Sequence, residues 1–223
     1  MIHVKTKIER PSKELIDRFR GIGTATVHEA YGRKGAVDSA IKPMRSGVRV
    51  CGPAFTVQCH PGDNLMLHKA LERAQPGDVL VTTVEGYYEA GYWGALMATS
   101  AVARGLGGLA IDGCVRDSAE IIKMGFPIFC RGFCIKGTTK TVLGWINHPI
   151  LFGGILVHPG DLILGDDDGM VVVRREECGT VLENSIQRIE AEKKKEQKLK
   201  SGTSSVELNK LEKVFEALGL VEE

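Results

Sequence analysis

The sequence predicts an α/β fold with a mixed β-sheet and a C-terminal helical arm, on three observations. Between residues 95 and 132, helical patterns alternate with short apolar runs, which is typical of βαβ units with parallel strands. Between residues 153 and 177, three β-rich runs are separated by "HPGD" and "GDDDG", which indicates antiparallel strands joined by turns. After residue 189 the chain is almost wholly charged and favours helix.

The first half of the chain shows helices and strands in a clear order. Short helices are predicted from Ser12 and over 24–32, where Gly32 would end the second. A strand is predicted over 48–60, and Pro53 within it favours an edge strand or a bulge. The next helix, over 62–77, has a cap candidate in Asp63 and an apolar face formed by Leu67, Ala70, Leu71 and Ala74.

The middle of the chain supplies the predicted βαβ units. A β-branched run predicts a strand at 78–84. It is followed by a helix, a strand, a second helix and a second strand, over 95–105, 108–112, 116–125 and 127–132.

With 223 residues, the chain is long enough for one sizeable domain with an appendage. We expect a single α/β domain over 1–175 and the arm over 176–223. The charged helix of the arm should project from the body. The last segment repeats apolar residues at helical spacing and needs a partner surface, which predicts packing on a neighbouring subunit. Those residues are Leu208, Leu211, Phe215 and Leu218.

The composition excludes several classes of protein. Lys and Arg number 29 against 28 Asp and Glu, so no overall field favours nucleic acid or an anionic membrane. No apolar run approaches the roughly 20 residues of a membrane helix, and the N-terminal stretch lacks the apolar core of a signal peptide. The six cysteines lack C-x-x-C spacing, which favours free thiols over a zinc site. We expect a cytoplasmic protein that binds small molecules, with no nucleic-acid or membrane partner.

The turn after the strand at 108–112 places Arg116 and Asp117 at the start of a helix. Ligands gather beyond the carboxyl ends of strands in open α/β sheets, and helix N-termini favour anions. Arg116 would supply a fixed cation and Asp117 a carboxylate for a hard divalent ion. A structural interpretation is equally open on these residues alone, because Asp117 and Glu120 have the spacing of a capping box.

A second junction favours the functional interpretation. Gly91 and Gly94 directly precede the helix over 95–105, where backbone amides could close on a ligand. Two helix N-termini would then face one pocket, which suits a metal-bound 2-oxo acid. A dinucleotide-binding turn is excluded because the glycines at 105–108 precede their strand instead of following it, and P-loop, G-x-S-x-G and H-E-x-x-H motifs are absent.

Two other groups of residues favour structural roles. The sequence "GDDDG" at 165–169 lacks EF-hand spacing and favours a solvated turn over a cation site. The histidines are scattered, and each favours a surface or core position over a metal ligand; they are His3, His28, His60, His68, His148 and His158.

The segment "WGALMATSAVARGLGGLAIDGCVRDSAEIIKMGFPIFCRG" resembles the signature of the 4-hydroxy-4-methyl-2-oxoglutarate / 4-carboxy-4-hydroxy-2-oxoadipate aldolase family, a group that also includes the regulator of ribonuclease activity A. The similarity continues through "CIKGTTK", "NHPILFGG" and "VHPGDLILGDDDGMVVV" and covers most of residues 20–205. It implies a swivelling β/β/α sandwich that assembles as a homotrimer, or as a hexamer of two trimers, with active sites at subunit interfaces.

The resemblance also implies roles for individual residues. Arg116 would hold the substrate's keto oxygen and carboxylate, and Asp117 would ligate Mg²⁺ or Mn²⁺. Asn64 would touch the substrate. Glu192, in the arm, would act as a catalytic group at a neighbouring subunit's metal site. The pyruvyl carboxylate would be bound by the backbone amides of Gly94, Ala95, Leu96 and Met97.

The implied function is a divalent-metal-dependent class II pyruvate aldolase that also decarboxylates oxaloacetate through the same enolate. One departure concerns Ala95, where family aldolases often carry an aspartate that helps to hold a water at the metal. The group that moves the substrate's proton is therefore open: either Glu192 or another carboxylate supplies the base, or the protein has shifted to an easier reaction such as oxaloacetate decarboxylation. The alternative is a non-catalytic, protein-binding regulator of ribonuclease activity, in which Arg116 and Asp117 form only a cap and a salt bridge.

Overall fold

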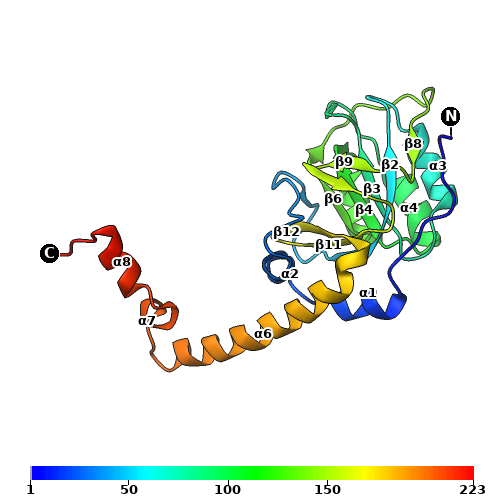
Figure 1. The fold of residues 1–223 in the computed structure, drawn as a ribbon. Helices are drawn as coiled ribbons and strands as arrows, with labels where there is room; N and C mark the ends of the chain where they lie inside the picture. The colour runs from blue at the N-terminus through cyan, green and yellow to red at the C-terminus, as the bar shows by residue number, and fades with distance from the viewer. Residues whose placement is uncertain (1) are drawn as a thin grey trace.

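The computed structural model describes residues 2–223, and a mixed β-sheet lies at the centre of the body (Figure 1). Four parallel strands form its middle, in the order β6–β4–β3–β2. Antiparallel strands extend it: β1 beside β6, β11 and then β12 beyond β2, and β8 against the end of β2. The strands are β1 (Lys42–Pro43), β2 (Val50–Gln58), β3 (Val79–Thr83), β4 (Gly108–Asp112), β6 (Ile128–Cys130), β8 (Trp145–Ile146), β11 (Leu162–Asp166) and β12 (Gly169–Val173). The predicted mixture of parallel and antiparallel strands is confirmed.

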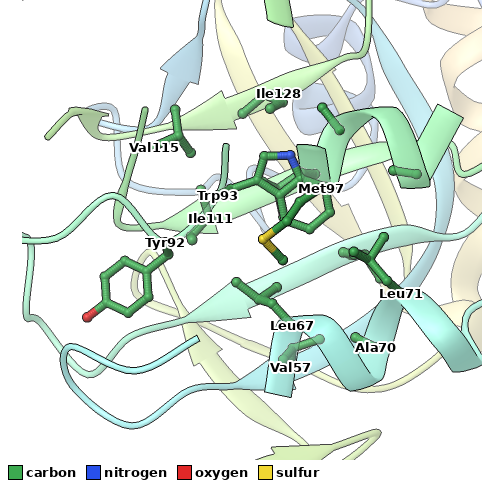
Figure 2. Close-up of a cluster of buried hydrophobic side chains, with 14 of the residues drawn as sticks. Val57, Leu67, Ala70, Leu71, Tyr92, Trp93, Met97, Ile111, Val115 and Ile128 are labelled. Carbon is green, nitrogen blue, oxygen red and sulfur yellow. The ribbon is translucent and has the colours of Figure 1, made fainter. Parts of the chain in front are cut away.

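Helices cover one face of the parallel strands. They are α3 (Leu65–Arg73), α4 (Ala95–Ala103) and α5 (Ser118–Met124). The predicted apolar face of α3 is fully buried in the core beneath them, as shown by Leu67, Ala70, Leu71 and Ala74. Figure 2 shows part of this core, which includes Trp93 and Met97 together with Val57 and Ile111 of the sheet. The burial of Trp93 fixes the segment that leads into α4.

A second layer of strands covers the opposite face. The antiparallel hairpin of β9 (Ile150–Phe152) and β10 (Ile155–Val157) packs Phe152 and Val157 against Val81 and Ala110 of the sheet. The layers are therefore hairpin, sheet and helices, which is the predicted β/β/α sandwich.

A third group of helices packs beside β11 and β12. It consists of α1 (Lys13–Phe19), α2 (Thr24–Ala30) and the first turns of α6 (Cys178–Lys200), which share one apolar cluster with these strands. Cys178, Val181 and Leu182 anchor α6 there.

The later turns of α6 leave the body, and α7 (Ser205–Asn209) and α8 (Glu212–Leu218) lie at its far end (Figure 1). The apolar segment predicted to need a partner is only partly covered. Leu208, Leu211 and Phe215 are half-buried, and Leu218 is 80% exposed.

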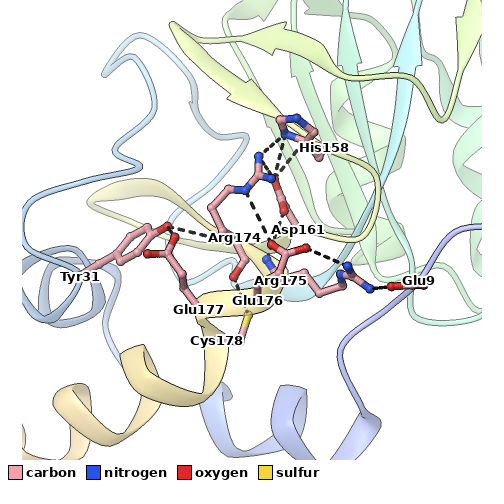
Figure 3. Close-up of polar contacts among 9 residues, drawn as sticks. All are labelled: Glu9, Tyr31, His158, Asp161, Arg174, Arg175, Glu176, Glu177 and Cys178. Atoms are coloured by element: carbon pink, nitrogen blue, oxygen red, sulfur yellow. Dashed lines mark hydrogen bonds and ion pairs between the residues drawn. The ribbon is translucent and has the colours of Figure 1, made fainter.

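A network of polar contacts holds the base of the arm (Figure 3). Arg174 contacts His158 and lies 3.5 Å from the buried Asp161. Tyr31, directly after α2, donates a hydrogen bond to Glu177, and Arg175 pairs with Glu9. These contacts join the N-terminal segment, α2 and the 3-10 turn η1 (Arg175–Glu177) just before α6 begins.

The prediction that Pro53 marks an edge strand or a bulge is wrong. β2 lies between β3 and β11, and its register with both is regular. The proline is tolerated because the N–H of Ala54 bonds to Asp161 on the β11 side, so the missing N–H of Pro53 falls on the β3 side. The pairing with β3 begins only at Ala54.

The three aspartates at 166–168 do form a turn between strands, but the first of them is not solvated. Asp166 is buried and accepts hydrogen bonds from the backbone N–H and the hydroxyl of Thr24, at 2.8 and 2.6 Å. It thereby holds the start of α2. Asp167 accepts from Ser46 and Gly47.

Within residues 2–223, no helix combines the length and the apolar character that crossing a membrane requires.

Candidate active site

A pocket of about 250 Å³ lies where α3, α4 and α5 begin. Asn64 directly precedes α3, Gly94 precedes α4, and Asp117 precedes α5. This is the position beyond the parallel strands where ligands of open α/β sheets bind. The lining residues are Asn64, His68, Gly91, Tyr92, Gly94, Leu96, Met97, Arg116, Asp117, Gly137, Thr138 and Lys140.

The Asp117 side chain bonds to the start of α4 and not to its own helix, α5. Its side chain makes no capping bond to α5, and its Oδ2 accepts a hydrogen bond from the N–H of Ala95 at 3.0 Å. The capping-box interpretation with Glu120 is therefore wrong. The backbone of Asp117 is left-handed, with φ at 57°, which costs a non-glycine residue on the order of 1 kcal/mol. The carboxylate is 40% exposed.

The two predicted glycines are required by close packing. A Cβ at Gly94 would lie 2.5 Å from Asp117 Oδ2, and a Cβ at Gly91 would lie 2.3 Å from the carbonyl oxygen of Cys134. The segment 91–94 also bonds to the segment 114–116, through Tyr92 N–H to Cys114 and Arg116 N–H to Trp93. These glycines let the start of α4 approach the Arg116–Asp117 turn.

Two of the four amides expected to bind a carboxylate are available. The N–H of Ala95 bonds to Asp117, and that of Met97 bonds to the carbonyl of Gly94 at 3.1 Å. The N–H groups of Gly94 and Leu96 have no hydrogen-bond partner within residues 2–223. The expected roles of Ala95 and Met97 as carboxylate-binding amides therefore do not fit this arrangement.

Arg116 lies beside these amides. Its Nε is 3.9 Å from Asp117 Oδ2, a loose contact, and its side chain is 47% exposed. Among the described residues it makes no other ion pair. A guanidinium that is not committed to a protein carboxylate can bind an anionic ligand.

Asn64, predicted to touch the substrate, is buried at the pocket wall with a free acceptor. Its Nδ2 donates to the carbonyl of Tyr92 at 2.8 Å, which fixes the orientation of the amide. Its Oδ1 has no hydrogen-bond partner in the described part of the chain. A buried acceptor left unpaired is costly and can be satisfied by a ligand hydroxyl.

The structure adds two charged or titratable residues that the sequence interpretation missed. His68 lies one turn after Asn64 on α3, and Lys140 comes from the loop before β8. Partial burial and the nearby charge of Lys140 lower the pKa of His68. The signal for His68 was its i, i+4 spacing from Asn64, which places both on one face of the helix. Lys140 had no such local signal.

Asp63 positions the loop that carries Thr138 and Lys140. It is 1% exposed, and its Oδ2 accepts from Thr139 Oγ1 at 2.8 Å and from the N–H of Thr141 at 2.6 Å. Its Oδ1 accepts from the N–H of Leu65, the first residue of α3, as the predicted cap would. Burial alone would raise the pKa of Asp63, but these hydrogen bonds outweigh it and hold the pKa below the ordinary 3.8.

Glu192 lies outside this pocket. It is on the projecting part of α6, paired with Arg188 at 2.8 Å, and is 47% exposed. The structure of one chain therefore does not bring Glu192 together with Arg116 and Asp117.

The chain belongs to the RraA-like family, described as Aldolase/RraA, whose family model matches residues 24–172. A relative from Halalkalibacterium halodurans is 39% identical over 172 residues, 77% of this chain and 82% of its own length, and carries the provisional name 4-hydroxy-4-methyl-2-oxoglutarate aldolase. RraAS2 from Streptomyces coelicolor, whose crystal structure is described as that of an unusual member of the RNase ES inhibitor RraA protein family, superposes with a TM-score of 0.76 at 30% identity. That comparison covers 84% of this chain and 98% of the other. An uncharacterized protein from Pseudomonas syringae gives a TM-score of 0.80 at 27% identity, covering 91% and 100%.

Replacing Asp63 with Asn should destabilise the protein and reduce its sensitivity to acid. At pH 7, the lost charged acceptor should lower the free energy of unfolding by about 1–3 kcal/mol. Because the pKa is depressed in the folded state, the contribution of Asp63 is complete above the unfolded pKa of 3.8 and is lost as pH falls through the folded value. The wild-type protein should therefore lose more stability than Asp63→Asn as pH falls from 5 to 2.

Urea unfolding at each pH measures this difference. Asp168→Asn serves as the matched control, because the Asp168 side chain makes no hydrogen bond in the described structure. If the free energy of unfolding depends on pH in the same way in both variants, Asp63 does not hold the loop.

Proposed function

We propose that the protein is a divalent-metal-dependent class II aldolase. It would cleave 4-hydroxy-4-methyl-2-oxoglutarate or 4-carboxy-4-hydroxy-2-oxoadipate to pyruvate and a second oxo acid, and would also decarboxylate oxaloacetate. The observation that carries the proposal is the meeting, in one pocket, of the Asp117 carboxylate, the Arg116 guanidinium and the two free amides of α4. The provisional name of the 39% identical relative supports it.

The residues present fit a Mg²⁺ or Mn²⁺ ion that is bound largely by substrate and water. Within residues 2–223 there is no group of three or more His, Cys, Asp or Glu side chains that could hold a metal, so Asp117 would be the ligand from this chain. Its Oδ1 makes no hydrogen bond in the described structure. Mg²⁺ commonly uses one or two carboxylates and completes its coordination with substrate and water. When bound, the ion would supply Lewis-acid stabilisation of the substrate's keto oxygen.

The protein groups would bind and orient the 2-oxo acid. The N–H groups of Gly94 and Leu96, at the positive end of α4, would hold its carboxylate. Arg116 would stabilise the negative charge that develops on the keto oxygen as the C3–C4 bond breaks. The free Oδ1 of Asn64 would accept a hydrogen bond from the substrate's hydroxyl.

We also propose that the active unit is a trimer or a hexamer of two trimers. Leu96, at the pocket, is 87% exposed in the single chain, and Val214 and Leu218 of α8 are exposed in the arm. Large apolar side chains exposed beside a site favour cover by another subunit. The same assembly would allow Glu192 to reach a neighbour's pocket.

Sedimentation equilibrium tests the assembly. The expected mass is three or six times the 24.2 kDa of the chain. A monomer at micromolar concentration would contradict it.

Pyruvate release tests the reaction. With Mg²⁺ present, 4-hydroxy-4-methyl-2-oxoglutarate and oxaloacetate should both yield pyruvate. A chelator or the Asp117→Ala substitution should reduce turnover by roughly 100-fold or more, because each removes charge stabilisation at the developing enolate. Glu120→Ala is the matched control: Glu120 is exposed on α5, does not line the pocket, and its replacement should leave turnover unchanged.

No pyruvate above the background of free metal would contradict the aldolase. Arg116 and Asp117 would then be structural, and capture of a ribonuclease by the intact protein would support the regulator instead.

A further inference from the structure

The proposed cleavage needs a group that removes the proton of the substrate's C4 hydroxyl. Ala95 cannot do so, and the backbone N–H of Ala95 is already bonded to Asp117. The assignment of that group rests on the proposed aldolase function.

Five titratable side chains line the pocket: His68, Tyr92, Arg116, Asp117 and Lys140. Arg116 and Lys140 are cations that offer only donors. Tyr92 accepts from the N–H of Gly62 and donates to the carbonyl of Tyr87, and burial raises its pKa to about 12. Asp117 is committed to the N–H of Ala95 and to the proposed metal. His68 remains.

We infer that His68 is the general base that takes the C4 hydroxyl proton. His68 and Asn64 lie one turn apart on the same face of α3, and both line the pocket that Arg116 and Asp117 also line. With the 2-oxo acid end held by Arg116 and the α4 amides, the C4 hydroxyl would extend toward α3. Asn64 Oδ1 would orient the hydroxyl, and an imidazole nitrogen of His68 would accept its proton.

The surroundings of His68 favour its neutral, proton-accepting form. Lys140 lies beside it in the loop before β8, and Arg104, directly after α4, lines the adjoining cavity with it. Glu72 and Lys69, on α3 itself, are paired with each other, and the Glu72 carbonyl accepts from Arg104. Arg116 and Asp117 line the same pocket. Partial burial and the charge of Lys140 lower the pKa of His68, so its imidazole is mainly neutral at pH 7.

The proton and the electrons balance in this scheme. The proton passes from the C4 oxygen to His68, the O–H electron pair forms the C4 carbonyl, and the C3–C4 bonding pair forms the enolate of pyruvate. Water then supplies one proton to C3, and the imidazolium of His68 returns one to water. Oxaloacetate decarboxylation forms the same enolate from a substrate with no C4 hydroxyl, so it needs C3 protonation but not His68.

The test compares the two reactions in one variant. In His68→Asn, kcat for cleavage of 4-hydroxy-4-methyl-2-oxoglutarate should fall by about 100-fold or more, the usual contribution of a general base. Decarboxylation of oxaloacetate should stay within a factor of about three, which also shows that the variant is folded and holds its metal. His28→Gln is the control histidine variant, because His28 is on α2, bonded to the Lys34 carbonyl, and does not line the pocket.

A measurement on the wild-type protein keeps the inference testable even if His68→Asn does not fold. At pH values below the pKa of His68, the ratio of the cleavage rate to the decarboxylation rate should decrease, because the imidazole becomes protonated. At pH values above that pKa, the ratio should stay constant. A ratio that does not change with pH overturns the inference, as does a His68→Asn variant that loses both reactions equally or neither. If the wild-type protein turns over neither substrate, the proposed aldolase function is contradicted, and so is the role of His68 that rests on it.

Discussion

One hydrogen bond joins the starts of two helices: the N–H of Ala95 in α4 donates to Oδ2 of Asp117, which precedes α5, at 3.0 Å. The contact requires Gly94, because a Cβ there would lie 2.5 Å from the same oxygen. It also accounts for the left-handed backbone of Asp117, which turns the carboxylate away from its own helix. The positions of Arg116, the free α4 amides and the exposed carboxylate oxygen all follow from it. The pocket is therefore organised before any ligand binds.

Much of the fold follows from local sequence patterns. The strand predicted at 108–112 is β4 residue for residue, and the run at 78–84 contains β3, because β-branched residues between glycine-marked turns specify buried parallel strands. The order of neighbouring strands in the sheet could not be predicted from local patterns. Pro53 suggested an edge, yet β2 is central, because the order of the strands depends on contacts between β2 and β11 that lie about 110 residues apart in the chain.

The candidate site likewise contains features that local sequence patterns predict and features that depend on distant parts of the chain. Gly94, Arg116 and Asp117 are close in sequence to the junctions that form the pocket, and their juxtaposition could be predicted from those junctions. Which amides remain free could not, because the acceptor for Ala95 comes from the next βα unit. Lys140 enters only because Asp63 ties its loop across the start of α3. His68 shares a helical face with Asn64. Its proposed role as a base depends on Arg116, Asp117 and Lys140, which other elements bring to the same pocket.

In the proposed function, Asp117 and the start of α4 would together bind a divalent metal ion and the enolate of a 2-oxo acid. Oxalate, a planar dianion that resembles the enolate of pyruvate, tests this most directly in a calorimetric titration of the intact protein. We expect oxalate binding that is at least about 100-fold tighter with Mg²⁺ than with chelator, and that is lost in Asp117→Ala. Oxalate affinity that is the same without Mg²⁺, or unchanged in Asp117→Ala, would contradict it.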